Sequence, residues 1–272
     1  MKQDFSEDTV NEGWKRWVGA AAGRFVTPER TPMVSKETIT NSLPHIGDTR
    51  RVIVAAGGPS LWLNVDRIIY GDDDLMIADQ SSLFWLRDHN YYPDMVVLSD
   101  PNKAATEKLK DAIERSEWSG LVVAGVHVDL DFDYDNTLFM PMLLVRNGEV
   151  ATRYNNIISS MFAGDLFIAQ AGSVTNATVL LCAALKRAGI WKPKDVVLVG
   201  VDLMNPYNEE EGLFHTHVGE VSSVGDPMTK PEAFEEYRKQ LAMILEVTKG
   251  DIHVTLANPG SPLLSFVEEW HD

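Results

Sequence analysis

The sequence predicts an α/β protein with a doubly wound, mostly parallel Rossmann-like sheet, helices on both faces and a lid insertion. Three observations predict it. Short β-branched apolar runs recur from Arg51 onward, separated by helix-length segments. Small polar residues directly follow several of these runs, and one long segment, 204–230, has no apolar period. Apolar runs without alternation are typical of strands covered on both faces.

The expected strands and helices follow in chain order. Helix ends carry their own signals: Ser173 can cap a helix, Gly189 stands where a C-terminal glycine belongs, and Ser261-Pro262 is typical of a helix start. The strands are predicted at Val52–Ala56, Leu75–Ala78, Met95–Leu98, Leu121–Ala124, Val196–Val199 and His253–Leu256, and the main helices at Asn102–Arg115, Ser173–Ala188 and Pro231–Thr248.

The chain divides into an N-terminal arm, 1–49, and one nucleotide-binding domain, 50–272. Residues 27–44 are rich in Pro, Thr and Ser, which predicts an irregular connection. Trp14 and Trp17 either dock on the chain's own core, which we favour, or face a partner chain in a homo-oligomer. Residues 204–230 are predicted to form a lid over the strand ends.

Charge and composition exclude several classes of function. The 272 residues carry 24 basic and 40 acidic side chains, a net charge of −16, which disfavours nucleic-acid binding. The single cysteine, Cys182, excludes an internal disulfide and a cysteine-rich metal site, and its expected role is packing. Neither a membrane span nor a secretory signal stands out, so we expect a cytoplasmic protein.

Polar residues at the ends of the predicted strands are the candidate binding residues. Ligands of open α/β sheets bind beyond the carboxyl ends of the strands. A glycine turn there lets a phosphate approach main-chain N–H groups, although Gly-Gly-Pro also serves as a plain turn. The candidates are Gly57, Gly58, Pro59 and Ser60 after the first strand, Asp79 and Gln80 after the second, Asp100 and Asn102 after the third, and Asp202 after the fifth.

The three aspartates have competing interpretations. Each can cap the following helix or accept a hydrogen bond from a ribose hydroxyl. Asp79 and Asp100 could instead hold Mg²⁺ beside a pyrophosphate, the one cofactor that the sequence suggests. Metal binding is therefore expected only if the reaction depends on Mg²⁺.

Two further segments carry candidate residues. Gly172, Ser173 and Thr175 begin a long helix, where they either donate to an anion or simply cap the helix. His215 and His217 lie in the predicted lid, where an imidazole can act as general base, bind a metal or have no role.

The order of these motifs resembles a known superfamily. It joins the motility accessory factor glycosyltransferases, the archaeal 6-hydroxymethyl-dihydropterin pyrophosphokinase-like proteins and the bacterial lipooligosaccharide sialyltransferases. The motifs that carry the resemblance, over about residues 50–270, are Val54–Leu61, Ile77–Leu83, Tyr92–Pro101, Gly172–Ala177, Val197–Leu203, Thr216-His217 and Asn258–Leu264.

This resemblance implies a transferase with its nucleotide between Gly57–Ser60 and the helix start at Ser173–Thr175. The sialyltransferases have asparagine where this chain has Asp79 and Asp100, a departure that leaves metal dependence open. His217 is the closer match to the motility-factor Thr-His, and His215 the second. The leading hypothesis is a glycosyltransferase whose partners are a CMP-nonulosonic acid donor and an acceptor that the sequence does not identify. The alternatives are a Mg²⁺-dependent pyrophosphokinase acting on a pterin-like molecule and a non-catalytic binding or assembly module.

Overall fold

The computed structural model describes most of the predicted domain and part of the arm. Trp14 and Trp17 lie outside the described residues. So do Pro59, Asp100 and Asn102. The described residues are 18–24, 32–58, 60–68, 71–99, 103–144, 149–163, 165–170, 173–193, 195–202, 207–208, 213–217, 220–223, 231–259 and 261–271.

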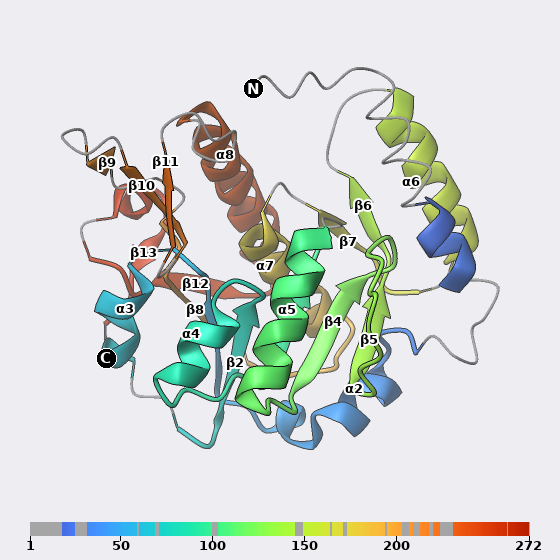
Figure 1. The fold of residues 1–272 in the computed structure, drawn as a ribbon, viewed down its shortest axis with the longest axis horizontal. Coiled ribbons are helices and arrows are strands. Elements are labelled where there is room, and N and C mark those ends of the chain that lie inside the picture. The colour runs from blue at the N-terminus through green and yellow to red at the C-terminus, as the bar shows by residue number, and fades with distance from the viewer. Residues whose placement is uncertain are drawn as a thin grey trace.

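The centre of the molecule is an eight-stranded sheet in which every neighbouring pair is parallel, so the predicted α/β fold class is confirmed (Figure 1). The strand order is β13-β12-β8-β1-β2-β3-β4-β5. The strands are β1 (Arg51–Ala55), β2 (Asp74–Asp79), β3 (Met95–Leu98), β4 (Leu121–Gly125), β5 (Thr137–Met140), β8 (Asp195–Val199), β12 (His253–Leu256) and β13 (Glu268–Glu269).

This strand order contains a topological switch point between β1 and β8. The chain builds the sheet outward from β1 to β5 and then returns to place β8 on the other side of β1. At the carboxyl edge, Ala55 of β1 pairs with both Val199 of β8 and Ala78 of β2. The connections that follow these strands therefore leave the sheet close together and in diverging directions, which is where open α/β sheets bind ligands.

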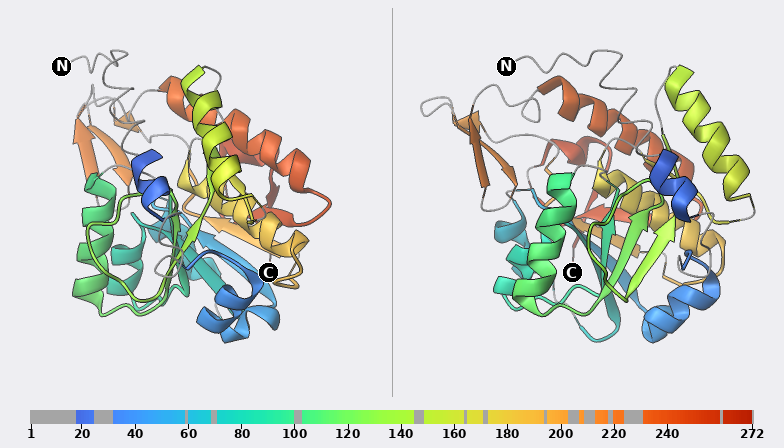
Figure 2. Two further views of the ribbon diagram at one scale, coloured as in Figure 1. Left: turned by 90° about the vertical axis from the view of Figure 1, so that its right-hand side faces the viewer. Right: turned by 45° about the vertical axis from the view of Figure 1, so that its right-hand side comes forward.

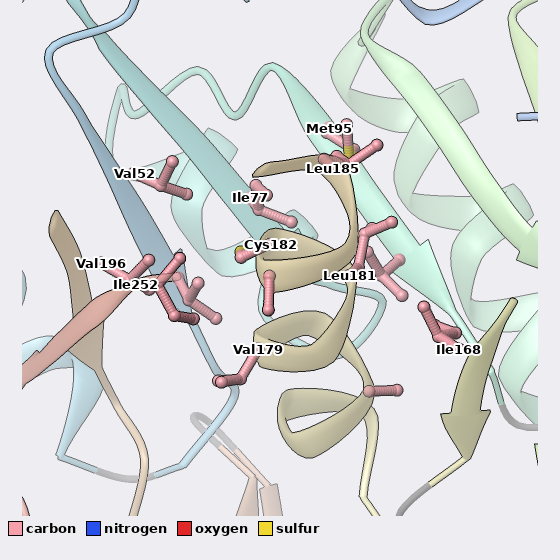
Figure 3. Close-up of a cluster of buried hydrophobic side chains, with 14 of the residues drawn as sticks. Val52, Ile77, Met95, Ile168, Val179, Leu181, Cys182, Leu185, Val196 and Ile252 are labelled. Atoms are coloured by element: carbon pink, nitrogen blue, oxygen red, sulfur yellow. The ribbon is translucent and has the colours of Figure 1, made fainter. Parts of the chain in front are cut away.

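Helices cover both faces of the sheet (Figures 1 and 2). Side chains alternate along β1: Ile53 packs in a cluster with residues of α3, α4 and α5, and Val52 packs with α2, α7 and α8 on the other face. Figure 3 shows α7 lying across the strands, with Cys182 among the packed side chains and fully buried, as expected. The helices are α2 (Lys36–Ser42), α3 (Leu61–Asn64), α4 (Leu83–Asp88), α5 (Lys103–Ser116), α6 (Glu149–Met161), α7 (Val174–Arg187) and α8 (Pro231–Thr248).

The capping signals worked as predicted. The Ser173 hydroxyl accepts a hydrogen bond from the Asn176 N–H at 3.1 Å, and Gly189 adopts φ +65° just after α7. The predicted start at Ser261-Pro262 is also present, but it opens a four-residue 3₁₀ helix, η5 (Pro262–Ser265), rather than a longer helix. No helix in the described part of the chain combines the length and the apolar character that a membrane span needs.

Two predicted irregular segments contain regular structure. Within 27–44, Ser35 and Thr38 form a reciprocal capping box that starts α2, whose Ile39 is fully buried. The short helices η2 (Pro44–Gly47) and η3 (Val65–Arg67) and the parallel pair β6 (Met142–Leu144) and β7 (Ile168–Gln170) were also not predicted. These elements are too short for a clear apolar period, and tertiary packing selects them.

The segment 204–230 is not simply a loop. Its described residues form a three-stranded antiparallel sheet of β9 (Tyr207–Asn208), β10 (Leu213–His217) and β11 (Glu220–Ser223), which lies above α3 in Figure 1. Val218-Gly219, which follows β10 in the sequence, is not one of the Asn-Gly, Asp-Gly or Gly-X pairs that mark a two-residue hairpin, so this sheet has no strong local signal. The role of this sheet as a lid remains a prediction.

Candidate binding site at the switch point

The glycine turn after β1 lies against the turn after β8. The Gly58 N–H donates to the Gly200 carbonyl at 2.9 Å, and Gly200 adopts φ +69°. A Cβ on Gly58 would lie 2.3 Å from that carbonyl oxygen, and one on Gly200 would lie 2.3 Å from the Ala56 carbonyl oxygen. Since no side chain fits at these distances, glycine at 58 and 200 lets the two turns touch.

Asp79 clamps the same glycine turn from β2. Its Oδ2 accepts the Gly57 N–H at 3.0 Å. Its Oδ1 accepts the Ser81 hydroxyl at 2.7 Å and the N–H groups of Ser81 and Ser82 at 3.1 and 2.8 Å. The carboxylate thus joins β1 to the start of α4 and makes the local N–H contacts expected of a capping residue.

A second carboxylate, Asp202, holds the other side of the turn. Its Oδ2 accepts the Ser60 N–H at 2.8 Å, and its Oδ1 accepts the Asn258 amide at 3.0 Å. Burial raises the pKa of Asp202, and the hydrogen bonds from Ser60 and Asn258 oppose that rise.

Asn258 and Asn64 complete this network, and neither was among the predicted site residues. The Asn258 amide also donates to the Ser60 hydroxyl at 3.0 Å, and the Asn64 amide donates to Asn258 Oδ1 at 3.3 Å. Both asparagines are buried. Asn258 could have been found by the rule used for the other candidates, because it closely follows a predicted strand.

In this structure the N–H groups of the glycine turn donate to acceptors of the protein itself. Those of Gly57 and Ser60 donate to the two carboxylates, and that of Gly58 donates to a backbone carbonyl. Carboxylates are acceptors only, so they take up donors that a ligand phosphate would otherwise use. The turn is built by a closed set of hydrogen bonds.

Gln80 is an exception within this saturated edge. Its Oε1 is buried and has no hydrogen-bond partner among the described residues. Leaving a buried amide oxygen unpaired costs free energy, so this oxygen is suited to accept a hydrogen bond from a ligand O–H or N–H.

The next strand end is held by a buried histidine. His127 follows β4, and its Nε2–H donates to the Ser99 carbonyl at 3.0 Å, directly after β3. Burial lowers the pKa of His127 to about 4, so the ring is neutral at physiological pH. Sequence reasoning gave this residue no role, because a lone histidine after a strand carries no signal.

The other candidates are not joined to this network by the described contacts. Ser173 caps α7, and Thr175 is buried in that helix. His215 and His217 lie on β10, whose pairing with β11 shifts register between them. The structure therefore brings together Gly57, Gly58, Ser60, Asp79, Gln80 and Asp202, whereas Pro59, Asp100, Asn102 and Gly172 lie outside the described residues.

Among protein families, the model described as 6-hydroxymethylpterin diphosphokinase MptE-like matches residues 29–208. This match confirms the superfamily resemblance of the motifs. It begins before the predicted domain boundary at 50 and ends at β9. The comparison with curated proteins found no match.

Solved structures with a similar fold include a MAf glycosyltransferase from Magnetospirillum magneticum AMB-1, with 16% identity and a TM-score of 0.54 over 86% of this chain. This chain covers only 37% of that protein. The Campylobacter jejuni sialyltransferases CstII, solved with cytidine-5'-monophosphate, and Cst-I are 16% and 14% identical, with TM-scores of 0.43 and 0.44. The alignments cover 82% and 88% of this chain and 86% and 83% of theirs. At 16% identity, the similarity to the MAf glycosyltransferase shows a similar fold and no more. The sialyltransferase alignments have lower TM-scores and add no further argument.

Proposed function

The chain belongs to the 6-hydroxymethylpterin diphosphokinase MptE-like family, and from this premise we propose that it is a glycosyltransferase using a nucleotide-activated sugar. The observation that carries this choice is the set of hydrogen bonds around Asp79. Both of its oxygens accept N–H or O–H donors of the protein. Diphosphate transfer needs Mg²⁺ to neutralise charge, whereas a departing sugar-nucleotide phosphate can be stabilised by hydrogen-bond donors alone.

The proposed donor is a CMP-nonulosonic acid such as CMP-sialic acid, and the support for it is the order of motifs in the sequence. In this proposal the nucleotide lies across the switch point. Gln80 Oε1 accepts from the nucleotide, and Asp79 and Asp202 keep the glycine turn in shape rather than touching the phosphate. The phosphate is then proposed to meet the Ser173 hydroxyl and the first N–H groups of α7, ahead of the Asn176 N–H that Ser173 caps.

The proposed general base is His217, with His215 as second candidate. Either imidazole would deprotonate the acceptor hydroxyl as the bond from the sugar to the phosphate breaks, so the proton passes to histidine and the nucleotide leaves as an anion. Closure of the β9–β11 sheet would exclude water, whose attack gives hydrolysis in place of transfer.

The test is CMP release from CMP-sialic acid, measured alongside the thermal shift caused by CMP. We expect His217→Ala to lower CMP release at least about 100-fold, the usual contribution of a general base, while the CMP thermal shift persists. His45→Ala serves as the matched control, because His45 is an exposed residue of η2 with an ordinary surface setting. Equal rates in wild type and His217→Ala contradict the assignment of the base, and the absence of both CMP binding and turnover contradicts the proposed donor.

The description of the matched family favours a second candidate, transfer of a diphosphoryl group from ATP to a hydroxyl of a small heterocycle with release of AMP. Of the two predicted Mg²⁺ ligands, Asp79 already accepts four hydrogen bonds from the protein, which leaves it little capacity for a metal, and Asp100 lies outside the described residues. Mg²⁺-dependent ATP binding, measured by calorimetry with and without EDTA, would support this candidate over sugar transfer. The absence of Mg²⁺-dependent ATP binding would contradict this second candidate.

A further inference from the structure

A groove between α3 and α4 lies outside the network at the switch point. Its cavity of about 380 Å³ is lined by Trp62, Val65, Asp66, Trp85, His89 and Tyr91. This volume is within the range of small-molecule sites. Figure 1 shows α3 and α4 on one face of the sheet, below the β9–β11 sheet.

The groove adjoins the proposed nucleotide site through the chain itself. Trp62 is two residues beyond Ser60, whose N–H and hydroxyl belong to the Asp202 network. Trp85 is three residues beyond Ser82, whose N–H is held by Asp79. The turns that close the switch point therefore lie at the starts of α3 and α4, the two helices that carry these indoles.

The walls of the groove are aromatic. Trp62 is 57% exposed, a large fraction for an indole on a helix that packs against the core. The Trp85 ring stacks on His89 with centroids 4.0 Å apart, which fixes both rings. Flat rings held in place offer apolar area at little cost in conformational entropy.

The polar atoms that the groove presents to solvent are hydrogen-bond acceptors. His89 Nδ1 contacts the Trp85 carbonyl at 2.8 Å, and because a carbonyl only accepts, Nδ1 is the donor; in that tautomer Nε2 is the acceptor. The Tyr91 hydroxyl donates to Asp66 Oδ1, which leaves Oδ2 without a partner among the described residues. Asp66 and His89 are both exposed.

We propose that this groove is a saccharide-binding site. A sugar ring has apolar C–H faces for the indoles and several hydroxyl donors for Asp66, His89 and Tyr91. A cation enclosed by aromatic rings fits less well, because the single carboxylate is already hydrogen-bonded by Tyr91 and one face of Trp85 is covered by His89. As the acceptor subsite of the transferase the groove rests on the proposed function, whereas its binding of sugars does not.

The test is isothermal titration calorimetry of the full chain with lactose, maltotriose and chitobiose, in parallel with CMP. We expect at least one sugar to bind, and Trp62→Ala and Asp66→Asn each to weaken that binding about tenfold or more. Phe84→Ala is the matched control: Phe84 is an exposed aromatic residue of the same α4 helix, and the Arg115 guanidinium of α5 lies over its ring. It should bind sugar as wild type does.

The outcomes separate this proposal from the proposed function. Absence of sugar binding by wild type, or unchanged binding in both groove variants, overturns the saccharide site, and so does binding of tetramethylammonium in preference to every sugar. CMP binding should persist in Trp62→Ala. Absence of CMP binding by the wild-type protein would contradict the proposed function without bearing on the saccharide site. Circular dichroism melting of each variant excludes unfolding as the cause of lost binding.

Discussion

The switch point and the α3–α4 groove share helices but differ in how their polar groups are used. At the switch point, the described donors of the glycine turn are bound to protein acceptors, and Asp79 alone accepts four hydrogen bonds. In the groove, Asp66 and His89 keep acceptor atoms open to solvent. The glycine turn is thus held by hydrogen bonds within the protein, whereas the groove presents acceptor atoms to solvent.

The largest expected effect tests whether the close contact between the two turns at the switch point is needed for the stability of the fold. Gly200→Ala should lower the free energy of unfolding by roughly 2–5 kcal/mol, because it adds a left-handed alanine and a Cβ 2.3 Å from the Ala56 carbonyl oxygen. Gly189→Ala is the control, since Gly189 has φ +65° but no atom within 4 Å of an added Cβ. It should lose only about 1–2 kcal/mol in urea denaturation. Equal losses in the two variants would show that the turns do not need to touch.

Low pH is expected to lower the free energy of unfolding through the buried His127. The folded pKa of His127, about 4, lies below the ordinary value of 6.5, so the neutral ring stabilises the fold above pH 6.5 and that stability is lost as pH falls toward 4. We expect a loss of about 3 kcal/mol from this group over that range. His127→Gln should make the unfolding free energy less dependent on pH. The exposed His45→Gln should keep the wild-type pH dependence, and a His127→Gln profile that matches wild type would show that the ring is already charged in the fold.

The smallest expected effect tests whether the hydrogen bonds of Asp79 stabilise the fold. Asp79→Asn replaces one acceptor oxygen by an NH₂ group that faces N–H donors, so unfolding should become easier by about 1–3 kcal/mol. Asp88→Asn makes the same charge change at an exposed site on α4 and should be nearly neutral. If Asp79→Asn is as stable as wild type and gains affinity for CMP, the clamp is not structural and the carboxylate repels phosphate instead.

Much of the fold could be predicted from the sequence because buried parallel strands leave a strong local pattern of apolar residues. The runs at β3 and β12 and the helix α8 were predicted with the observed ends, and Ser173 and Gly189 fixed the ends of α7. The hairpin of β10 and β11 was missed because its apolar residues are few. Asn258 was missed as a site residue because the motif Asn258–Leu264 pointed to the family and not to a contact, although it follows a strand as the other candidates do.

The sequence alone determined that the chain forms a parallel α/β sheet and that glycine and aspartate residues gather at its carboxyl edge, since these features depend on local apolar runs and on the common direction of parallel strands. Tertiary structure decided which groups those residues contact. Whether an N–H of the turn meets a phosphate or a carboxylate depends on the approach of β2 and β8 to β1, which no local pattern encodes. The groove of Trp62 and Trp85 likewise exists only because α3 and α4 pack on one face of the sheet.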